Sequence, residues 1–266
     1  MGDEATQIEM VHVLEQDPAL GRHLPPGARY QANSAAVAPV LSLARGVRSF
    51  VSDEPPPRGH LGLLILDGLI ALHVTFGQIG ATEFLGPCDV LRPWAMSETV
   101  DVAEACWETL TPVRLAVLDR EFATRVRPWP EMAAALFDRY TERLASQLLY
   151  FALRQAKRVD DRVLVTLWHF AVRWGQVSAE GRIVPLPNIT GESLGNIVGA
   201  RRQSVSTALG ALVNRGAIQR RSDGSWLIRT KPPQLQQLNH ESARRAVAHL
   251  YQDPSRRIAA AKATAK

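Results

Sequence analysis

A short segment near residue 200 concentrates side chains that can bind nucleic acid. Arg202 and Gln203 are adjacent, and in the major groove Arg pairs bidentately with guanine while Gln pairs with adenine. Small or hydroxyl-bearing residues surround them, which would let a helix backbone approach DNA closely. A solvated helix face usually mixes Glu and Lys, and residues 201–214 contain neither. The pattern predicts DNA contacts from Arg201, Arg202, Gln203, Ser204, Ser206 and Thr207.

Two short helices must position that segment. Thr190 is a good N-cap for a first helix that runs to Val198. Gly199-Ala200 makes a tight turn, a second helix begins at about Arg201, and Gly216 suits the C′ position at its end. Two short helices joined by a Gly-containing turn predict a helix-turn-helix.

A basic hairpin is predicted directly after the second helix. Residues 217–228 read as two alternating strands joined by Asp223-Gly224, which signals a two-residue turn. Arg220 and Arg221 lie beside that turn and could reach phosphates. Such a hairpin alone is weak evidence for DNA binding, but directly after a helix-turn-helix in the sequence it predicts the wing of a winged helix.

The charge of the chain is divided unevenly. Of 266 residues, 31 are Lys or Arg and 26 are Asp or Glu. Residues 1–153 hold 12 of the basic and 19 of the acidic residues, and residues 154–266 hold 19 and 7. The basic half is expected to face a polyanion. No apolar run approaches the roughly 20 residues that span a bilayer, so a cytoplasmic protein without membrane contact is expected.

No other motif indicates catalysis or a metal. The seven His residues are scattered without metal-ligand spacing, and Cys88 and Cys106 are too few for a four-cysteine site. No Gly-rich phosphate loop or nucleophile elbow is present. We predict no catalytic residue, no metal and no cofactor. His169, between Trp168 and Phe170, is expected to be a packed interdomain residue.

The first half of the chain predicts strands and then a long helix. A short helix is expected at 7–24, strands within 35–51 and at 113–118, and a hairpin at Asp67-Gly68 between the apolar runs 61–66 and 69–76. These indicate an antiparallel sandwich or barrel over about 35–120. A helix over 129–157 is long enough to favour pairing with a second copy over packing only on its own barrel. Another helix, with an Asp N-cap, is expected at about 161–174, and an edge strand at 182–187.

The chain resembles the Crp/Fnr family of bacterial transcription regulators over about residues 35–230. The most specific stretch is Ile-Thr-x-x-x-Leu-Gly-x-Ile-Val-Gly-x-x-Arg-x-x-Val at 189–205. The resemblance implies an α+β fold with an N-terminal antiparallel β jelly-roll like a cyclic-nucleotide-binding domain, a long dimerisation helix and a C-terminal winged helix-turn-helix. The implied divisions are a sensor barrel with an N-terminal helix at 1–128, the dimerisation helix at 129–158, the DNA-binding domain at 159–230 and an extension, partly disordered, at 231–266.

The resemblance also assigns contacts. The family's base-contacting Arg, Glu and Arg fall on Arg202, Gln203 and Thr207, and phosphate contacts fall near Thr190 and Ser204. This sequence keeps only the first of the three base-contacting residue types, at Arg202. We therefore expect the chain to bind DNA, but not at the usual operator sequence of the family.

The barrel departs from the family members that bind cyclic nucleotides. Arg92-Pro93 stands where those members carry a Gly-Glu pair, and residues 95–113 contain no Lys or Arg to neutralise a cyclic phosphate. The same stretch carries Glu98, Asp101, Glu104 and Glu108, which is unfavourable for an anion. The barrel is therefore not expected to bind cAMP in the usual way. Arg92 and Trp94 are the candidate ligand-binding residues.

These observations predict a sequence-specific regulator, not an enzyme, that binds double-stranded DNA as a homodimer on a near-palindromic operator. RNA polymerase and an unidentified small-molecule effector are further candidate partners. One alternative is an architectural DNA-binding dimer without a ligand, which the sequence does not separate from a gated regulator. Another is a catalytic barrel with an accessory DNA-binding domain, for which only His60 and His73 lie on the barrel strands.

Overall fold

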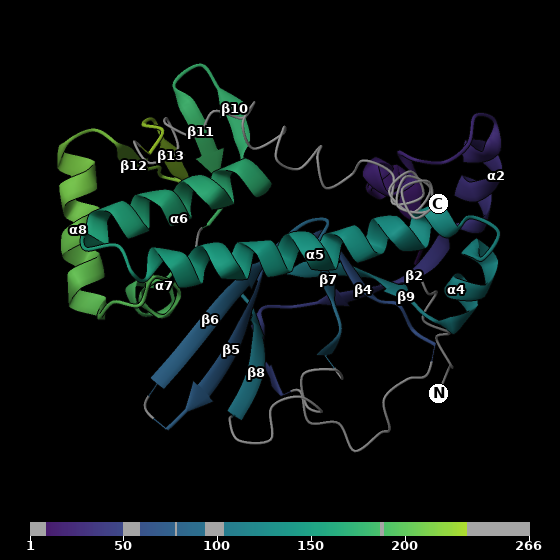
Figure 1. The fold of residues 1–266 in the computed structure, drawn as a ribbon, viewed down its shortest axis with the longest axis horizontal. Helices are drawn as coiled ribbons and strands as arrows, with labels where there is room; N and C mark the ends of the chain where they lie inside the picture. The colour runs from purple at the N-terminus through teal and green to yellow at the C-terminus, as the bar shows by residue number, and fades with distance from the viewer. Residues whose placement is uncertain (1–8, 50–58, 78, 94–103, 187–188, 233–266) are drawn as a thin grey trace, which may run out of the picture.

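Two antiparallel sheets form the N-terminal barrel of the computed structural model, which describes residues 9–49, 59–77, 79–93, 104–186 and 189–232 (Figure 1). One sheet has the order β1 (Met10–His12), β2 (Val37–Leu43), β9 (Val113–Leu118), β4 (Gly62–Asp67) and β7 (Val90–Leu91). The other has the order β3 (Gly46–Ser49), β8 (Glu104–Thr109), β5 (Ile70–Phe76) and β6 (Ile79–Leu85). Apolar side chains of both sheets, among them Ile65, Leu72, Trp107 and Leu115, fill the space between them. The predicted antiparallel sandwich is confirmed.

The hairpin predicted at Asp67-Gly68 is wrong. The strands on either side of this turn, β4 and β5, belong to different sheets, so the turn carries the chain from one sheet to the other. The hairpin is instead β5–β6, in which Phe76 lies opposite Ile79. An Asp-Gly pair reports a local turn conformation, and here Gly68 has φ +90°. It does not report which sheet the next strand joins.

The helix predicted at 7–24 is also wrong. This segment forms strand β1, a single helical turn α1 (Val13–Gln16) and a 3-10 turn η1 (Pro18–Gly21), followed by helix α2 (Ala28–Ala35). Val11 lies opposite Ala38, because β1 extends the first sheet beside β2. Pro18 cannot continue a helix from the preceding turn, and Asp17 instead caps η1 by accepting from the Ala19 N–H at 3.2 Å.

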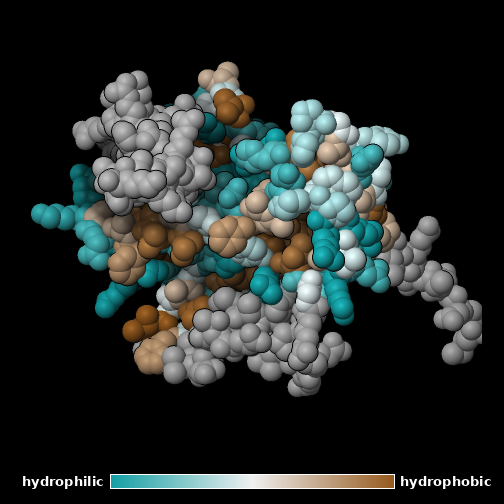
Figure 2. Space-filling view, turned by 45° about the vertical axis from the view of Figure 1, so that its right-hand side comes forward, coloured by the Kyte–Doolittle hydropathy of each residue, from teal (hydrophilic) through white to brown (hydrophobic). Residues whose placement is uncertain are grey.

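A long helix, α5 (Pro130–Leu153), follows α4 (Arg120–Val126) and spans the molecule from the barrel to the C-terminal elements (Figure 1). It ends four residues before the predicted end. Its inner side packs on the barrel through Met132 and Leu136. Its outer side leaves a stripe of large apolar side chains 61–70% exposed, and in Figure 2 hydrophobic residues gather in the band that α5 crosses. The stripe consists of Phe137, Leu144, Leu148 and Phe151.

The C-terminal elements form a winged helix. They are α6 (Val159–Arg173), β10 (Gln176–Ser178), β11 (Gly181–Val184), α7 (Gly191–Val198), α8 (Arg202–Asn214), β12 (Ile218–Arg220) and β13 (Trp226–Ile228). Their sheet has the order β10-β11-β13-β12, so the strand predicted as an edge, β11, lies between two others. The N-cap of α6 is Arg158 rather than an Asp, because the helix begins at Val159 and both Asp160 and Asp161 lie within its first turn.

The barrel and the winged helix share a continuous apolar core. Ala71 and Phe84 of the barrel belong to the same buried cluster as Phe170 of α6 and Ile197 of α7. The rings of Phe84 and Phe170 lie 5.6 Å apart, centroid to centroid. This core holds α6 and α7 against the barrel and so fixes where α8 is presented.

Candidate nucleic-acid interface

The turn between α7 and α8 depends on two local features. The Thr190 hydroxyl accepts a hydrogen bond from the Ser193 N–H at 2.9 Å, so Thr190 is the N-cap of α7 as predicted. At the other end Gly199 has φ +66°. A Cβ on Gly195 would lie only 2.5 Å from the carbonyl oxygen of Ala200, a distance that real side chains do not allow. The sequence thus permits a close approach of the two helices at this turn.

Helix α8 buries one face and exposes the rest. Val205, Ala208 and Leu212 are buried against α6 and α7. At its end the N–H of Gly216 donates to Val213 and that of Ala217 to Leu212, which is the Schellman arrangement expected for a C′ glycine. All nine predicted DNA-contact residues are exposed: Thr190, Arg201, Arg202, Gln203, Ser204, Ser206, Thr207, Arg220 and Arg221.

The exposed surface of α8 has two flanks that the sequence alone did not distinguish. Arg202 and Ser206 lie on the side of Gly191, near the N-terminus of α7. Ser204 and Thr207 lie on the opposite side, where they line an open recess of about 420 Å³ together with Arg158. Gln203 stands between these two groups on the helical wheel. Arg202 therefore lies on the flank away from the Ser204 and Thr207 hydroxyls.

Two arginines beside that recess were missed by the sequence-based prediction. Arg158 donates to the Asp160 carboxylate through Nε and Nη2 at 3.1 and 2.8 Å, and Arg215 donates through Nη1 at 2.9 Å. The hydrogen bonds from Arg158 lower the pKa of the Asp160 carboxyl below its usual value. Arg158 and Arg215 remain 68% and 42% exposed, so Asp160 orients two cations toward solvent. Only the fold brings residues 158 and 215 together.

The wing differs in one detail from its prediction. Arg220 lies opposite Trp226, and the Arg221 N–H donates to the Ser225 carbonyl, so the turn is longer than two residues. The Asp223 carboxylate accepts from the Ser225 N–H at 2.9 Å and closes this turn internally. Arg220 and Arg221 both lie at the surface beside it, as predicted.

Comparison with known proteins identifies this part of the chain. Residues 142–238 match the family model of the Crp-like helix-turn-helix domain. The chain contains a Crp-like helix-turn-helix domain. This domain comprises the end of α5, α6 to α8 and the wing, and it includes every predicted DNA-contact residue.

Solved structures show the same fold over most of the chain. A CooA variant from Carboxydothermus hydrogenoformans has a TM-score of 0.53 at 16% identity, covering 72% of this chain and 83% of that one. TTHA1359, a CRP/FNR-family transcriptional regulator from Thermus thermophilus, has a TM-score of 0.52 at 20% identity, covering 74% of this chain and 96% of that one. The c-di-GMP responsive regulator CLP from Xanthomonas campestris has a TM-score of 0.51 at 15% identity, covering 78% of this chain and 100% of that one. No curated protein sequence matches the chain.

These similarities confirm the predicted resemblance to the Crp/Fnr family and the predicted fold class, in which a Crp-like helix-turn-helix domain follows a barrel. Among the described residues no helix is long and apolar enough to cross a membrane.

The predicted ligand-binding residues, and the acidic residues near them, belong to the barrel. Arg92 follows β7 at an exposed position, and Trp94 lies outside the described residues, as do Glu98 and Asp101. Glu108 lies 3.7 Å from the His73 ring. Within the described ranges no group of His, Cys, Asp and Glu residues could hold a metal ion.

The remaining residues that could titrate or react are Cys88, Cys106 and His169, and their surroundings suit a structural role. Cys88 and Cys106 form no disulfide bond, and burial raises the pKa of Cys88 to about 11, which keeps Cys88 in the unreactive thiol form at neutral pH. The Tyr150 hydroxyl lies 2.7 Å from Nδ1 of His169, so His169 of α6 packs against the end of α5. Burial and the nearby Arg173 lower the pKa of His169 to about 4.

Proposed function

We propose that the chain is a transcription regulator of the Crp/Fnr type that binds a near-palindromic operator as a homodimer. The observation that carries this proposal is the surface of α8 in a Crp-like helix-turn-helix domain. Its apolar face is buried while Arg202, Gln203 and Ser206 are exposed together. A helix with that division can enter the major groove, where guanidinium and amide groups read base edges.

The remaining exposed residues fit the DNA backbone. In our proposal Arg202 and Gln203 contact bases, and Thr190 and Ser204 contact phosphates with Arg220 and Arg221 of the wing. Arg201, Ser206 and Thr207 lie along the same surface. Arg158 and Arg215 add positive charge beside Ser204. Phosphate contacts of this kind position a protein on DNA without specifying sequence.

The stripe on α5 supports the homodimer. Phe137, Leu144, Leu148 and Phe151 follow steps of seven, four and three residues, which matches the 3–4 spacing of a coiled-coil seam. Large apolar side chains that are more than 60% exposed on one helix face are typical of an interaction surface. Pairing two copies of α5 would place two α8 helices for successive major grooves.

We further propose that the barrel does not bind cAMP in the usual way. Arg92-Pro93 stands where family members that bind cyclic nucleotides carry a Gly-Glu pair, and the following residues to 113 supply no cation for a cyclic phosphate. Isothermal titration calorimetry with cAMP and cGMP should show no micromolar binding, and such binding would refute this part. Contact with RNA polymerase and a cytoplasmic location stay predictions.

Selection of genomic DNA fragments on the purified protein, followed by footprinting, tests the function. We expect protection of two related half-sites whose centres lie about 34 Å apart, one helical turn. Equal binding to all fragments with no shared half-site would contradict the proposal of sequence-specific regulation and favour an architectural role. Repeating the footprint with cell metabolites tests for an effector.

A further inference from the structure

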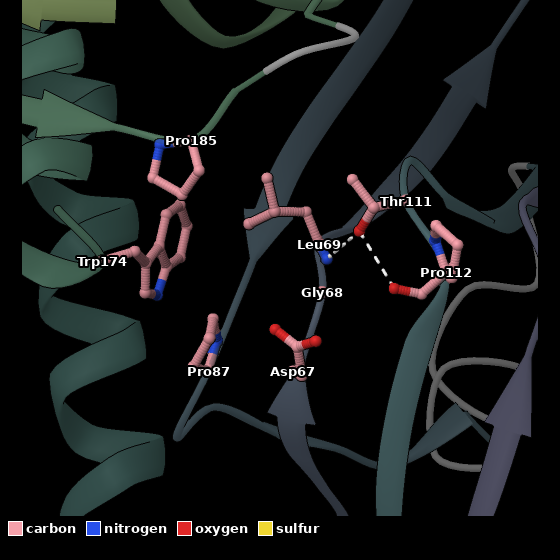
Figure 3. Close-up of a pocket in the computed structure, with 8 residues that line it drawn as sticks. All are labelled: Asp67, Gly68, Leu69, Pro87, Thr111, Pro112, Trp174 and Pro185. Atoms are coloured by element: carbon pink, nitrogen blue, oxygen red, sulfur yellow. Dashed lines mark hydrogen bonds between the residues drawn. The ribbon is translucent and has the colours of Figure 1, made fainter. Parts of the chain in front are cut away.

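A cavity of about 360 Å³ lies at the junction between the barrel and the Crp-like domain (Figure 3). The barrel contributes the turn from β4 to β5, and the other wall comes from the segments that follow α6 and β11. In Figure 3, Trp174 and Pro185 face the barrel residues across the opening. The volume is in the range of small-molecule sites, which also favour domain junctions. The cavity is lined by Asp67, Gly68, Leu69, Pro87, Thr111, Pro112, Trp174 and Pro185.

The lining combines apolar walls with one carboxylate. Leu69, Pro87, Pro185 and the Trp174 indole provide apolar surface. The Thr111 hydroxyl is already used, since it accepts from the Leu69 N–H at 2.9 Å and donates to the Pro112 carbonyl at 3.2 Å. The exposed Asp67 carboxylate forms no hydrogen bond or ion pair with another described residue. The lining therefore has negative charge to offer a ligand.

The basic residues nearest to the cavity have other partners. Arg173 lies over the Trp174 ring, 4.7 Å from its centroid, and pairs with the buried carboxylate of Asp89. Arg114 lies opposite Asp67 in the ladder between β4 and β9, and its guanidinium pairs with Glu9. Neither pairing leaves an uncompensated positive charge to repel a cation at Asp67.

We propose that this cavity binds a small organic cation with an apolar body, such as an arylalkylamine. The ammonium group would pair with the Asp67 carboxylate, and the apolar part would occupy the space between Leu69 and Trp174. Charge complementarity selects a cation over an anion here, and the apolar walls select an amine with a hydrophobic body over a simple hydrated ion.

Such a ligand would stabilise the present arrangement of the two parts of the chain. Trp174 is held in place by stacking on Phe170, with ring centroids 5.3 Å apart. It also fits against Gly86, where a Cβ would lie 2.7 Å from the indole. A ligand touching both Leu69 and Trp174 would add contacts across the junction and bind this arrangement more tightly than any other. Binding itself is independent of DNA; only an effect on operator affinity rests on the proposed function.

Calorimetry with phenethylamine tests the site, with the isosteric neutral 2-phenylethanol and the anionic 3-phenylpropionate as comparison ligands. We expect saturable binding of the amine, weaker binding of the alcohol and none of the acid. Asp67→Asn should weaken amine binding by about tenfold or more, because it removes the paired charge. Glu121→Gln, which removes an equal charge from a residue 85% exposed on α4, should leave it unchanged.

The position of the ligand is tested separately by NMR of the tryptophan indole N–H signals, with Trp174 assigned through Trp174→Phe. The Trp174 signal should shift on addition of phenethylamine and keep its position in Asp67→Asn at the same concentration. Binding that is equal for all three ligands, or unaffected by Asp67→Asn, would overturn the proposal. Amine binding that leaves operator affinity unchanged would support the site and refute its coupling to DNA.

Discussion

Arg173 of α6 donates a hydrogen bond to the carboxylate of Asp89, and this ion pair joins the Crp-like domain to the barrel. The Asp89 side chain is 7% exposed and also accepts from the Gly86 N–H at 2.9 Å. Burial raises the pKa of Asp89 even though Arg173 acts in the opposite direction. Burying these two charges costs free energy, and each charge is compensated only while its partner is present.

Breaking this pair from one side should destabilise the protein strongly. Asp89→Leu or Arg173→Met alone is expected to lower the free energy of unfolding by about 3–5 kcal/mol, because an unpaired buried charge is left, while the double variant should recover most of that loss. A double-mutant cycle by urea denaturation measures this coupling. The same cycle on the pair Arg125–Glu121, which is 3.7 Å apart and has a Glu121 side chain that is 85% exposed, should give less than about 1 kcal/mol. Equal couplings would contradict the structural role of the buried pair.

Base-reading and phosphate-binding residues should differ in how they affect DNA binding. Arg202→Ala is expected to cost about 1–3 kcal/mol at one base pair of each half-site and to relax specificity there. Arg221→Ala should weaken binding to all sequences alike and reduce the salt slope by about 1. Fluorescence anisotropy with a panel of single-base operator variants at several salt concentrations separates the two effects. If Arg202→Ala binds the operator normally, Arg202 does not contact the DNA.

The stripe on α5 should control the oligomeric state. Leu148→Glu places a charge in the apolar seam, so we expect monomers at concentrations where the original protein is dimeric. Tyr30→Glu is the matched control, since Tyr30 of α2 is 83% exposed and lies outside the stripe. Analytical ultracentrifugation distinguishes the two variants. A dimer unaffected by Leu148→Glu would assign the interface to another surface.

His169 should make stability fall in mild acid. Its pKa is about 4 in the folded protein and about 6.5 in an unfolded chain, so below pH 6.5 the unfolded state binds more protons. The free energy of unfolding should therefore decrease between pH 6.5 and 4, by up to about 2 kcal/mol at pH 5. Urea denaturation at pH 7.5 and 5 should show this loss reduced in His169→Gln. The exposed His23→Gln should behave like the unchanged protein.

The helix-turn-helix was predictable because its signals are local. Thr190 caps its own helix, Gly216 adopts the conformation that its own helix end requires, and the apolar spacing of α8 places Val205 and Leu212 inside. Each of these features depends on neighbours within a few residues. The β4–β5 turn at Asp67-Gly68 was mispredicted because the choice of sheet depends on strands that are distant in the sequence.

By itself the sequence determined the barrel, the long helix and the winged helix in their order, and the chemistry of the residues on α8. Hydrophobic periodicity, caps and turn residues suffice for that, since they act through neighbouring residues. Only the tertiary structure decided that Arg158 and Arg215 share Asp160, that Arg173 pairs with Asp89 and that Asp67 faces Trp174 across a cavity. Contacts between residues far apart in the chain leave no periodic signal in one sequence, because they arise from how the elements pack.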